Sequence, residues 1–334
     1  MASKGKNQLQ LDQGLGECHL VFGAIGQDGS YLSEQLCSEG KEVIGVIRPN
    51  SIIPEKYKHQ NINYVRGDIL DDDFILALLE TYSPSHVYNL ASASSVAESY
   101  LNSDLSKKIN LDFVEILISN IEKYQNRYKR EVFLLQASSS EMFGPDNKSP
   151  INEFSPHDPR SPYAEHKSIA HRLCQVARTD SNIKVGTAIL FNHESPRRPL
   201  KFVSRKISRG AFLISSGLEN KLILGNINVF RDWGYAPDYV GAMRIIALKT
   251  YSDDFVISTG KLHSLEEMCA IAFEAVGISN YKSYVQSDKS LYRTIENSGL
   301  KGDSKKINDI CGWAPTVTFD QMVKKMVSAE SIES

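Results

Sequence analysis

Short apolar runs alternate with stretches of helical spacing along the first 190 residues, and this alternation restricts the chain to few folds. In the first unit, an apolar run at 18–22 and a glycine-rich turn precede helical spacing over 31–39, which Gly40 ends as a C-cap. A second β-rich run follows at 41–47. A strand, a helix and a second strand within about 30 residues form a parallel pair with a right-handed crossover. We therefore predict a parallel sheet.

The same alternation continues to residue 191 and then breaks. Further strands are predicted at 63–65, 86–90, 131–136 and 184–191, and helices at 71–82, 105–124 and 161–178. They indicate an α/β fold, a doubly wound parallel Rossmann sheet with a smaller α/β C-terminal lobe. We assign residues 17–191 to the Rossmann domain and 192–330 mainly to a substrate lobe with segments that return to the sheet. Residues 1–16 are interpreted as a polar tail.

The charge balance and the spacing of cysteines exclude several classes of protein. The 334 residues carry 38 Lys and Arg against 40 Asp and Glu, whereas a nucleic-acid-binding protein usually has a basic excess. No apolar run reaches the roughly 20 residues of a membrane span. Five separated cysteines and eight histidines without ligand spacing predict reduced thiols, no metal site and a cytoplasmic protein.

The glycine-rich turn has the spacing GxxGxxG, with Gly23, Gly26 and Gly29 between a predicted strand and a predicted helix. Glycine lets the backbone approach a pyrophosphate, which the N–H groups and positive dipole of the helix N-terminus then bind. The turn, which also contains Gln27 and Asp28, is therefore a predicted dinucleotide site. Its spacing resembles that of short-chain dehydrogenase-type enzymes.

Arg48 ends the second predicted strand, where folds of this kind bind a ribose. An arginine there suits the 2′-phosphate of NADP, whereas an acidic residue suits NAD. The alternative is a solvated surface arginine. Asp68 is predicted to lie near the adenine, and its alternative is a turn aspartate.

Tyr163 and Lys167 form a YxxxK motif, and a spacing of four residues places both side chains on one face of a helix. We expect the lysine ammonium to lower the pKa of the tyrosine, which makes the phenol a general base near neutral pH. Ser139 and Glu141 follow a strand, at the sheet edge that faces the ligand crevice. The serine suits a reacting hydroxyl or ketone. Glu141 is an acid or base that simple alcohol oxidation does not need, or else a helix-start glutamate.

A basic set after residue 191 suits a second diphosphate through charge-assisted hydrogen bonds. The alternative for scattered arginines is a solvated face. The set comprises the segment NHESPRR at 192–198, the segment FVSRK at 202–206 with Arg205 and Lys206, and Arg231, Asp232 and Arg293.

The motifs GxxGxxG, SSSE, YxxxK and NHESPRR occur in an order that resembles the extended short-chain dehydrogenase/reductases. Within them, the segments GAIGQDGSYL, ASSSEMFG, FNHESPRR and RDWGYAPDYV are most similar to the GDP-mannose 4,6-dehydratases. The resemblance runs from about residue 18 to about 328. It implies a nucleotide-sugar 4,6-dehydratase that acts on a GDP-sugar with bound NADP, as a homodimer or homotetramer.

The resemblance also implies roles for matching residues. Tyr163 would remove the proton of the hexose 4-hydroxyl, Ser139 would hydrogen-bond O4, and Glu141 would take the C5 proton and help water leave C6. Lys167 would hold the nicotinamide ribose. Cofactor contacts are implied for Gly23, Gly26, Gln27, Asp28, Gly29, Arg48, Asp68, Ala91, Ser92, Tyr163, Lys167, His193 and Arg198, and substrate contacts for Ser94, Asn192, Lys206, Arg231, Arg293 and Glu296.

Departures from the family pattern keep other functions open. Ala91 and Ser95 replace a glycine and a histidine near the expected sugar pocket, so a GDP-heptose is a candidate substrate beside GDP-mannose. The loop after Arg48 is short, which favours a dimer. An NADP-dependent nucleotide-sugar 4-epimerase or 4-reductase needs no glutamate at position 141. A non-catalytic NADP-binding protein on the same fold is a further alternative.

Overall fold

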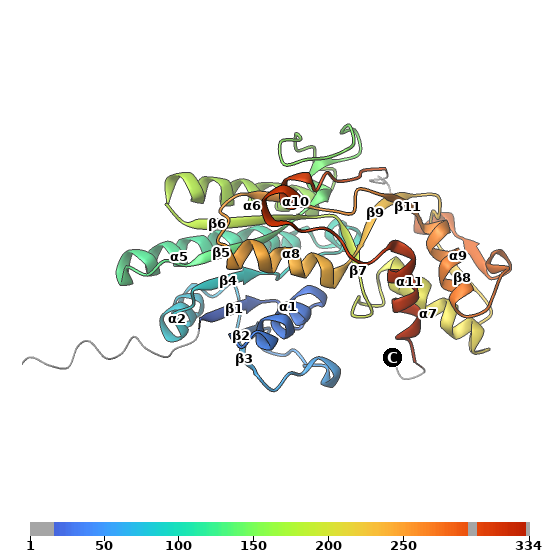
Figure 1. Ribbon diagram of the computed structural model, residues 1–334, viewed down its shortest axis with the longest axis horizontal. Helices are drawn as coiled ribbons and strands as arrows, with labels where there is room; N and C mark the ends of the chain where they lie inside the picture. Colours follow the sequence, from blue (N-terminus) through green and yellow to red (C-terminus); the bar gives the residue numbers. More distant parts are fainter. Residues whose placement is uncertain (1–16, 293–298, 332–334) are drawn as a thin grey trace, which may run out of the picture.

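The computed structural model describes residues 17–292 and 299–331. Within them, a seven-stranded parallel sheet has the order β10-β6-β5-β4-β1-β2-β3 (Figure 1). Its strands are β1 (Cys18–Phe22), β2 (Glu42–Ile47), β3 (Ile62–Arg66), β4 (His86–Asn89), β5 (Phe133–Ser139), β6 (Lys184–Leu190) and β10 (Asp254–Ile257). The predicted doubly wound parallel sheet is confirmed. The strand order reverses between β1 and β4, and the carboxyl ends of such strands border the ligand crevice.

Helices cover both faces of this sheet, because side chains of each strand alternate between two cores. Val21 belongs to the same core as Leu36 of α1 and Met243 of α8, whereas its neighbour Leu20 belongs to a second core with Leu79 of α2. The helices are α1 (Gln27–Ser38), α2 (Asp72–Tyr82), α3 (Val96–Leu101), α4 (Ser103–Lys107), α5 (Phe113–Tyr128), α6 (Pro162–Asp180), α7 (Val203–Ser215), α8 (Ala236–Leu248), α9 (Leu265–Ala275), α10 (Lys305–Cys311) and α11 (Phe319–Ser328).

A smaller lobe with its own core lies at the far end of the molecule from α2 and α5 (Figure 1). Helices α7, α9 and α11 bury Ile207, Phe273 and Met322 together against Trp233. Two short sheets belong to this region: β7 (Asn192–Glu194) with β9 (Phe230–Tyr235) and β11 (Leu262–Ser264), and β8 (Leu222–Leu224) with β12 (Val285–Ser287). Among the described residues, no helix combines the length and the apolar character that a membrane crossing requires.

Two helices differ from the sequence expectation. Helix α1 begins at Gln27 rather than at 31, because Gly29 belongs to the helix as well as to the glycine motif. The helix expected over 105–124 is divided into α4, a π-helical turn η2 (Lys108–Asp112) and α5. Asn110 in this turn is buried, accepts from Ser92 Oγ at 2.7 Å and donates to the Ala93 carbonyl at 3.3 Å. One added residue in a turn barely changes the apolar spacing, so the sequence pattern does not reveal it.

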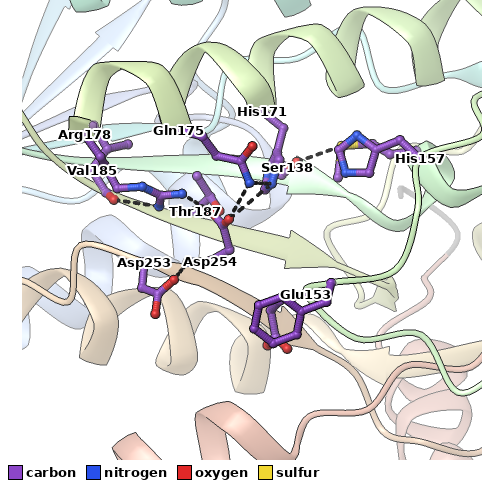
Figure 2. A network of polar contacts seen from close by, with 12 residues as sticks. Ser138, Glu153, His157, His171, Gln175, Arg178, Val185, Thr187, Asp253 and Asp254 are labelled. Atoms are coloured by element: carbon purple, nitrogen blue, oxygen red, sulfur yellow. Dashed lines mark hydrogen bonds and ion pairs between the residues drawn. The ribbon is translucent and has the colours of Figure 1, made fainter. Parts of the chain in front are cut away.

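A buried carboxylate holds β10 on the sheet (Figure 2). Asp254 accepts hydrogen bonds from Arg178 Nη2 at 2.6 Å, from Gln175 Nε2 at 2.8 Å and from the Thr187 hydroxyl. Burial alone would raise the pKa of Asp254. Hydrogen bonds and the nearby His171 outweigh burial and hold that pKa well below its usual range.

Replacement of Asp254 by asparagine is expected to destabilise the protein most at neutral pH. A carboxyl group with a lowered folded-state pKa adds stability that is fully present above its unfolded pKa of about 3.9 and is lost progressively as the pH falls from there toward the folded-state pKa. The loss at pH 7 should be about 2–4 kcal/mol, since Arg178 is left with an uncharged partner. Urea unfolding at pH 7 and near pH 3 measures this. A difference between wild type and variant that stays constant down to acid pH would contradict the assignment.

Candidate active site

The glycine turn forms a close-packed cradle at the start of α1. Gly23 has φ +80°, and a Cβ there would lie 2.8 Å from the Leu90 carbonyl oxygen. A Cβ at Gly29 would lie 2.2 Å from the Gly23 oxygen. Gly26 is the N-cap of α1. It has no side chain that could accept a hydrogen bond from the first N–H groups of the helix. The first N–H groups of α1 therefore remain available for an anion, and the residues fit a dinucleotide diphosphate.

Side chains of the first turn of α1 bind the segment after β6. Gln27 Nε2 donates to the His193 carbonyl at 3.1 Å, and Gln27 Oε1 accepts from Ser195 Oγ at 2.8 Å. Asp28 Oδ2 lies 3.0 Å from His193 Nε2. Burial opposes a charge on His193, but the charge and hydrogen bond of Asp28 prevail and raise the pKa of the imidazole. The segment is thus held to α1 by three side-chain hydrogen bonds.

The basic set does not form one ligand-facing patch, because several members have partners within the chain. Arg197 donates to both carboxylate oxygens of Glu34 at 2.8 Å. Lys201 Nζ lies 2.6 Å from a Glu98 oxygen. Arg205 Nε lies 2.7 Å from Glu330, whose side chain is fully buried. The expectation that Arg197 and Arg205 serve a diphosphate is therefore corrected, and the neighbouring Lys201 is paired as well.

Two further members of that set also have structural contacts. Asp232 is fully buried and accepts the backbone N–H groups of Thr259 and Gly260, both at 2.8 Å. Arg198 Nε lies 3.0 Å from Glu194, and its guanidinium lies over the Phe202 ring at 3.9 Å. Arg198 is near enough to Tyr163 for its charge to lower the pKa of the tyrosine.

The predicted catalytic side chains meet where β5 ends and α6 begins. Ser139 is the last residue of β5, and its Oγ accepts the backbone N–H of Glu141 at 3.3 Å. Tyr163 lies in the first turn of α6, which Ser161 caps through the N–H of Ala164. Hydrogen bonds with Ser139 and Ser92 act on the pKa of Tyr163. Both serines therefore lie beside the phenol.

The pKa of Tyr163 is raised, which corrects the expectation that Lys167 lowers it. Burial is the largest cause, and the charge of Glu141 adds to it, whereas hydrogen bonds with Ser139 and Ser92 oppose it. Lys167 is 3% exposed and donates from Nζ to the Ala137 carbonyl at 3.0 Å. Burial lowers the pKa of Lys167 to about 8. The ammonium is still the main form at pH 7, because its pKa lies above that value.

The other predicted ligand residues lie on several elements. Arg48 follows β2 and is exposed. Asp68 is exposed in a turn, where its carboxylate accepts the N–H of Leu70 at 3.0 Å. Ala91, Ser92 and Ser94 follow β4; Asn192 is half-buried in β7, Lys206 is exposed on α7, and Arg231 is buried in β9. Arg293 and Glu296 lie outside the described residues.

Two buried polar residues of the site, Ser99 and Asn110, were not predicted from the sequence. Ser99 of α3 accepts the backbone N–H of Tyr163 on its Oγ at 3.2 Å. Asn110 accepts a hydrogen bond from Ser92, and Ser92 lies beside Tyr163. A buried asparagine in an otherwise amphipathic helix was the available signal for Asn110. Ser99 carried none, because serines are common on solvated helices. Among the described residues, no group of three or more His, Cys, Asp or Glu side chains is arranged to hold a metal ion.

The chain is similar to known proteins over most of its length. Residues 20–326 match the family model described as GDP-mannose 4,6 dehydratase. The chain belongs to this family. It is 38% identical over 326 residues to GDP-mannose 4,6 dehydratase 1 of Arabidopsis thaliana, with 93% of this chain and 89% of that protein covered.

Solved structures share the fold of this family member. A UDP-glucose 4-epimerase of Thermus thermophilus in complex with NAD has a TM-score of 0.82 at 22% identity, over 93% of this chain and 98% of that one. RMD from Pseudomonas aeruginosa complexed with NADPH has a TM-score of 0.76 at 23% identity, over 94% and 98%. At this identity the likeness shows the fold.

Replacement of Gly29 by alanine is expected to destabilise the protein, because the added methyl group displaces the turn at Gly23. The cost should be about 1–3 kcal/mol, as for other overpacked sites. Gly241 of α8 is the matched control: a Cβ there meets nothing within 4 Å. Gly241→Ala should be neutral or stabilise by up to roughly 1 kcal/mol through helix propensity. Urea unfolding of both variants checks this, and equal effects would contradict the cradle.

Proposed function

We propose that this protein removes water from a GDP-sugar, GDP-mannose or a GDP-heptose, to give its 4-keto-6-deoxy form with bound NADP as a transient hydride carrier. Membership of the dehydratase family over residues 20–326 supports an enzyme of this kind. The observation that carries the proposal is the cluster of Ser139, Glu141 and Tyr163 at the carboxyl end of β5, with the buried Lys167 one helical turn away.

The cradle at Gly23, Gly26 and Gly29 would hold the diphosphate of NADP, and Arg48 would pair with its 2′-phosphate. Asp68, Ala91, Ser92, His193 and Arg198 border the remainder of the proposed cofactor site. Gln27 and Asp28 contribute by holding His193 in place. When bound, NADP supplies reversible acceptance of a hydride from the sugar. Both neighbouring structures named above contain a nicotinamide dinucleotide, which supports the general cofactor class.

Tyr163 is the proposed base that takes the proton of the sugar 4-hydroxyl at its phenol oxygen. Burial raises the pKa of Tyr163, so the phenolate needs local stabilisation. Hydrogen bonds with Ser139 and Ser92 and the charge of Arg198 favour the phenolate. Lys167 adds a buried positive charge on the same helix face. Ser139 also has a hydroxyl placed to hydrogen-bond O4 of the sugar.

Glu141 is the proposed group for the second proton transfer. A ketone at C4 acidifies the proton at C5, which a carboxylate can then remove. Glu141 is near enough to Tyr163 for its charge to raise the pKa of that tyrosine, and in the proposed mechanism both groups act on one sugar ring. Glu141 then transfers this proton to the hydroxyl group on C6, which leaves as water.

Sugar-nucleotide contacts are proposed for residues around the mouth of the crevice. Lys206 is exposed on α7, and Arg231 is buried in β9, so both elements bring a cation from the smaller lobe. Ser94 and Asn192 complete the proposed set within the described residues. Arg293 and Glu296 stay predictions from the sequence.

The runner-up is an NADP-dependent 4-epimerase or 4-reductase, which shares the tyrosine and lysine. A non-catalytic NADP-binding protein on this fold is the third reading. The position of Glu141 beside Tyr163 favours dehydration over both. A homodimer or homotetramer and a cytoplasmic location remain predictions, the latter supported by the five cysteines, which are free thiols.

Mass spectrometry of the full-length protein with NADP⁺ and single nucleotide sugars tests the function. We expect a product lighter by one water from GDP-mannose or a GDP-heptose, without net reduction of NADP⁺. An isomer of unchanged mass would favour the epimerase, and net hydride transfer would favour the reductase. Binding of NADP⁺ without conversion of any sugar would favour the non-catalytic reading.

Glu141→Gln should lower the rate of dehydration by about 10²–10⁴-fold, the usual contribution of a general base. The affinity for NADP⁺ should be unchanged, because the proposed role of Glu141 lies in the proton transfer at C5. Glu115→Gln is the matched control, since Glu115 is exposed on α5. Single-turnover product formation and calorimetric titration with NADP⁺ separate the two effects. Dehydration by Glu141→Gln at the rate of wild type would remove Glu141 from the mechanism.

A further inference from the structure

The loop between β2 and β3 begins at Arg48, the proposed ligand of the 2′-phosphate. A tight turn opens this loop, in which the Ser51 N–H donates to the Arg48 carbonyl at 3.1 Å. The 3₁₀ turn η1 (Glu55–Tyr57) lies farther along it. The Arg48 side chain is exposed, so its direction depends on how the turn beneath it is held.

Arg66 holds the near end of the loop. Its Nη1 donates to the carbonyl oxygens of Pro49 at 3.1 Å and Ser51 at 2.6 Å. Arg66 is the last residue of β3 and pairs in register with Ile47, directly before Arg48. One guanidinium therefore ties both carbonyls of the turn to the adjacent strand.

Arg197 holds the far end of the loop from the opposite side. Its guanidinium lies between two aromatic rings, 3.9 Å from the ring centroid of Tyr31 in α1 and 4.8 Å from that of Tyr57 in η1. The side chain is 15% exposed, and bonds to Glu34 and Ser30 Oγ fix it on α1. Cation–π contacts gain strength in such a partly desolvated place. Tyr57 is thus packed onto a cation that α1 holds in position.

We propose that Arg66 and Arg197 are positioning residues that fix the loop of Arg48 and thereby give the site its preference for a dinucleotide with a 2′-phosphate. This inference rests on the proposed function, in which Arg48 binds that phosphate. A loop already held in its bound conformation loses less conformational entropy when the phosphate binds. Arg66 and Arg197 donate hydrogen bonds to other groups of the protein, whereas Arg48 is exposed to solvent.

Calorimetric titration of the full chain with NADP⁺ and with NAD⁺ tests the inference. The variants are Arg48→Ala, Arg66→Met and Tyr57→Leu, the last of which removes the ring and leaves the contacts of Arg197 with α1. Each should raise the Kd for NADP⁺ by about three- to tenfold or more, the loss typical of a cation–π contact or a charged hydrogen bond. The Kd for NAD⁺ should not change, because NAD⁺ lacks the 2′-phosphate. This second value also reports that each variant is folded.

Arg127→Met is the matched control. Arg127 Nη1 lies 2.8 Å from Glu80 and its guanidinium lies 5.3 Å from the Tyr128 ring centroid, so it has the same kinds of contact as Arg197 on a surface helix. Neither Kd should change in this variant. The double variant Arg48→Ala, Arg66→Met should bind NADP⁺ no more weakly than Arg48→Ala alone, because a positioning residue acts through the residue that it positions.

The outcomes separate this inference from the proposed function. If Arg48→Ala leaves both Kd values unchanged, Arg48 is no phosphate ligand, and the cofactor assignment and the inference both fail. If Arg48→Ala weakens only NADP⁺ while Arg66→Met and Tyr57→Leu change neither Kd, the inference alone fails. Additive losses in the double variant would make Arg66 a direct ligand and overturn its positioning role.

Discussion

The close contact between Gly29 and the carbonyl oxygen of Gly23 is the constraint on which the site depends. A side chain at residue 29 would lie 2.2 Å from that oxygen, so only glycine lets α1 start directly above the end of β1. The same first turn then presents Gln27 and Asp28 to the segment after β6. This close approach of two backbone segments therefore shapes the glycine turn and orders the polypeptide that leads to the smaller lobe.

Sequence patterns predicted the sheet, the glycine turn and the helix that carries both Tyr163 and Lys167, because each depends on local spacing. Periods of two and of three to four residues report which side chains are buried. The π-helical turn η2 was not predicted, because it hardly alters that spacing. The predicted direction of the pKa shift of Tyr163 was wrong. Burial raises this pKa, and the extent of burial depends on which elements cover the phenol. Spacing within one helix carries no such information.

Charged side chains were identified from the sequence, but their partners were not. Arg197 pairs with Glu34, 163 residues away, and Arg205 pairs with Glu330, 125 residues away. Such pairs are set by the packing of α1 and of the C-terminal segment against the segment 192–215. A cluster of cations in a sequence therefore overstates the charge that a ligand meets. Arg48 and Lys206, which are exposed, are better candidates for phosphate contacts than Arg197 or Arg205.

The position of β10 has a consequence for synthesis of the protein. Strands β1 to β6 are complete at residue 190, yet the strand that covers the edge of β6 ends at residue 257. An unpaired hydrophobic edge is a template for pairing with other chains. While the ribosome adds the intervening segment, the nascent sheet exposes the edge of β6, which is buried along most of its length in the finished protein. The yield of soluble protein should therefore depend on how quickly that segment is translated, or on a chaperone that covers β6 meanwhile.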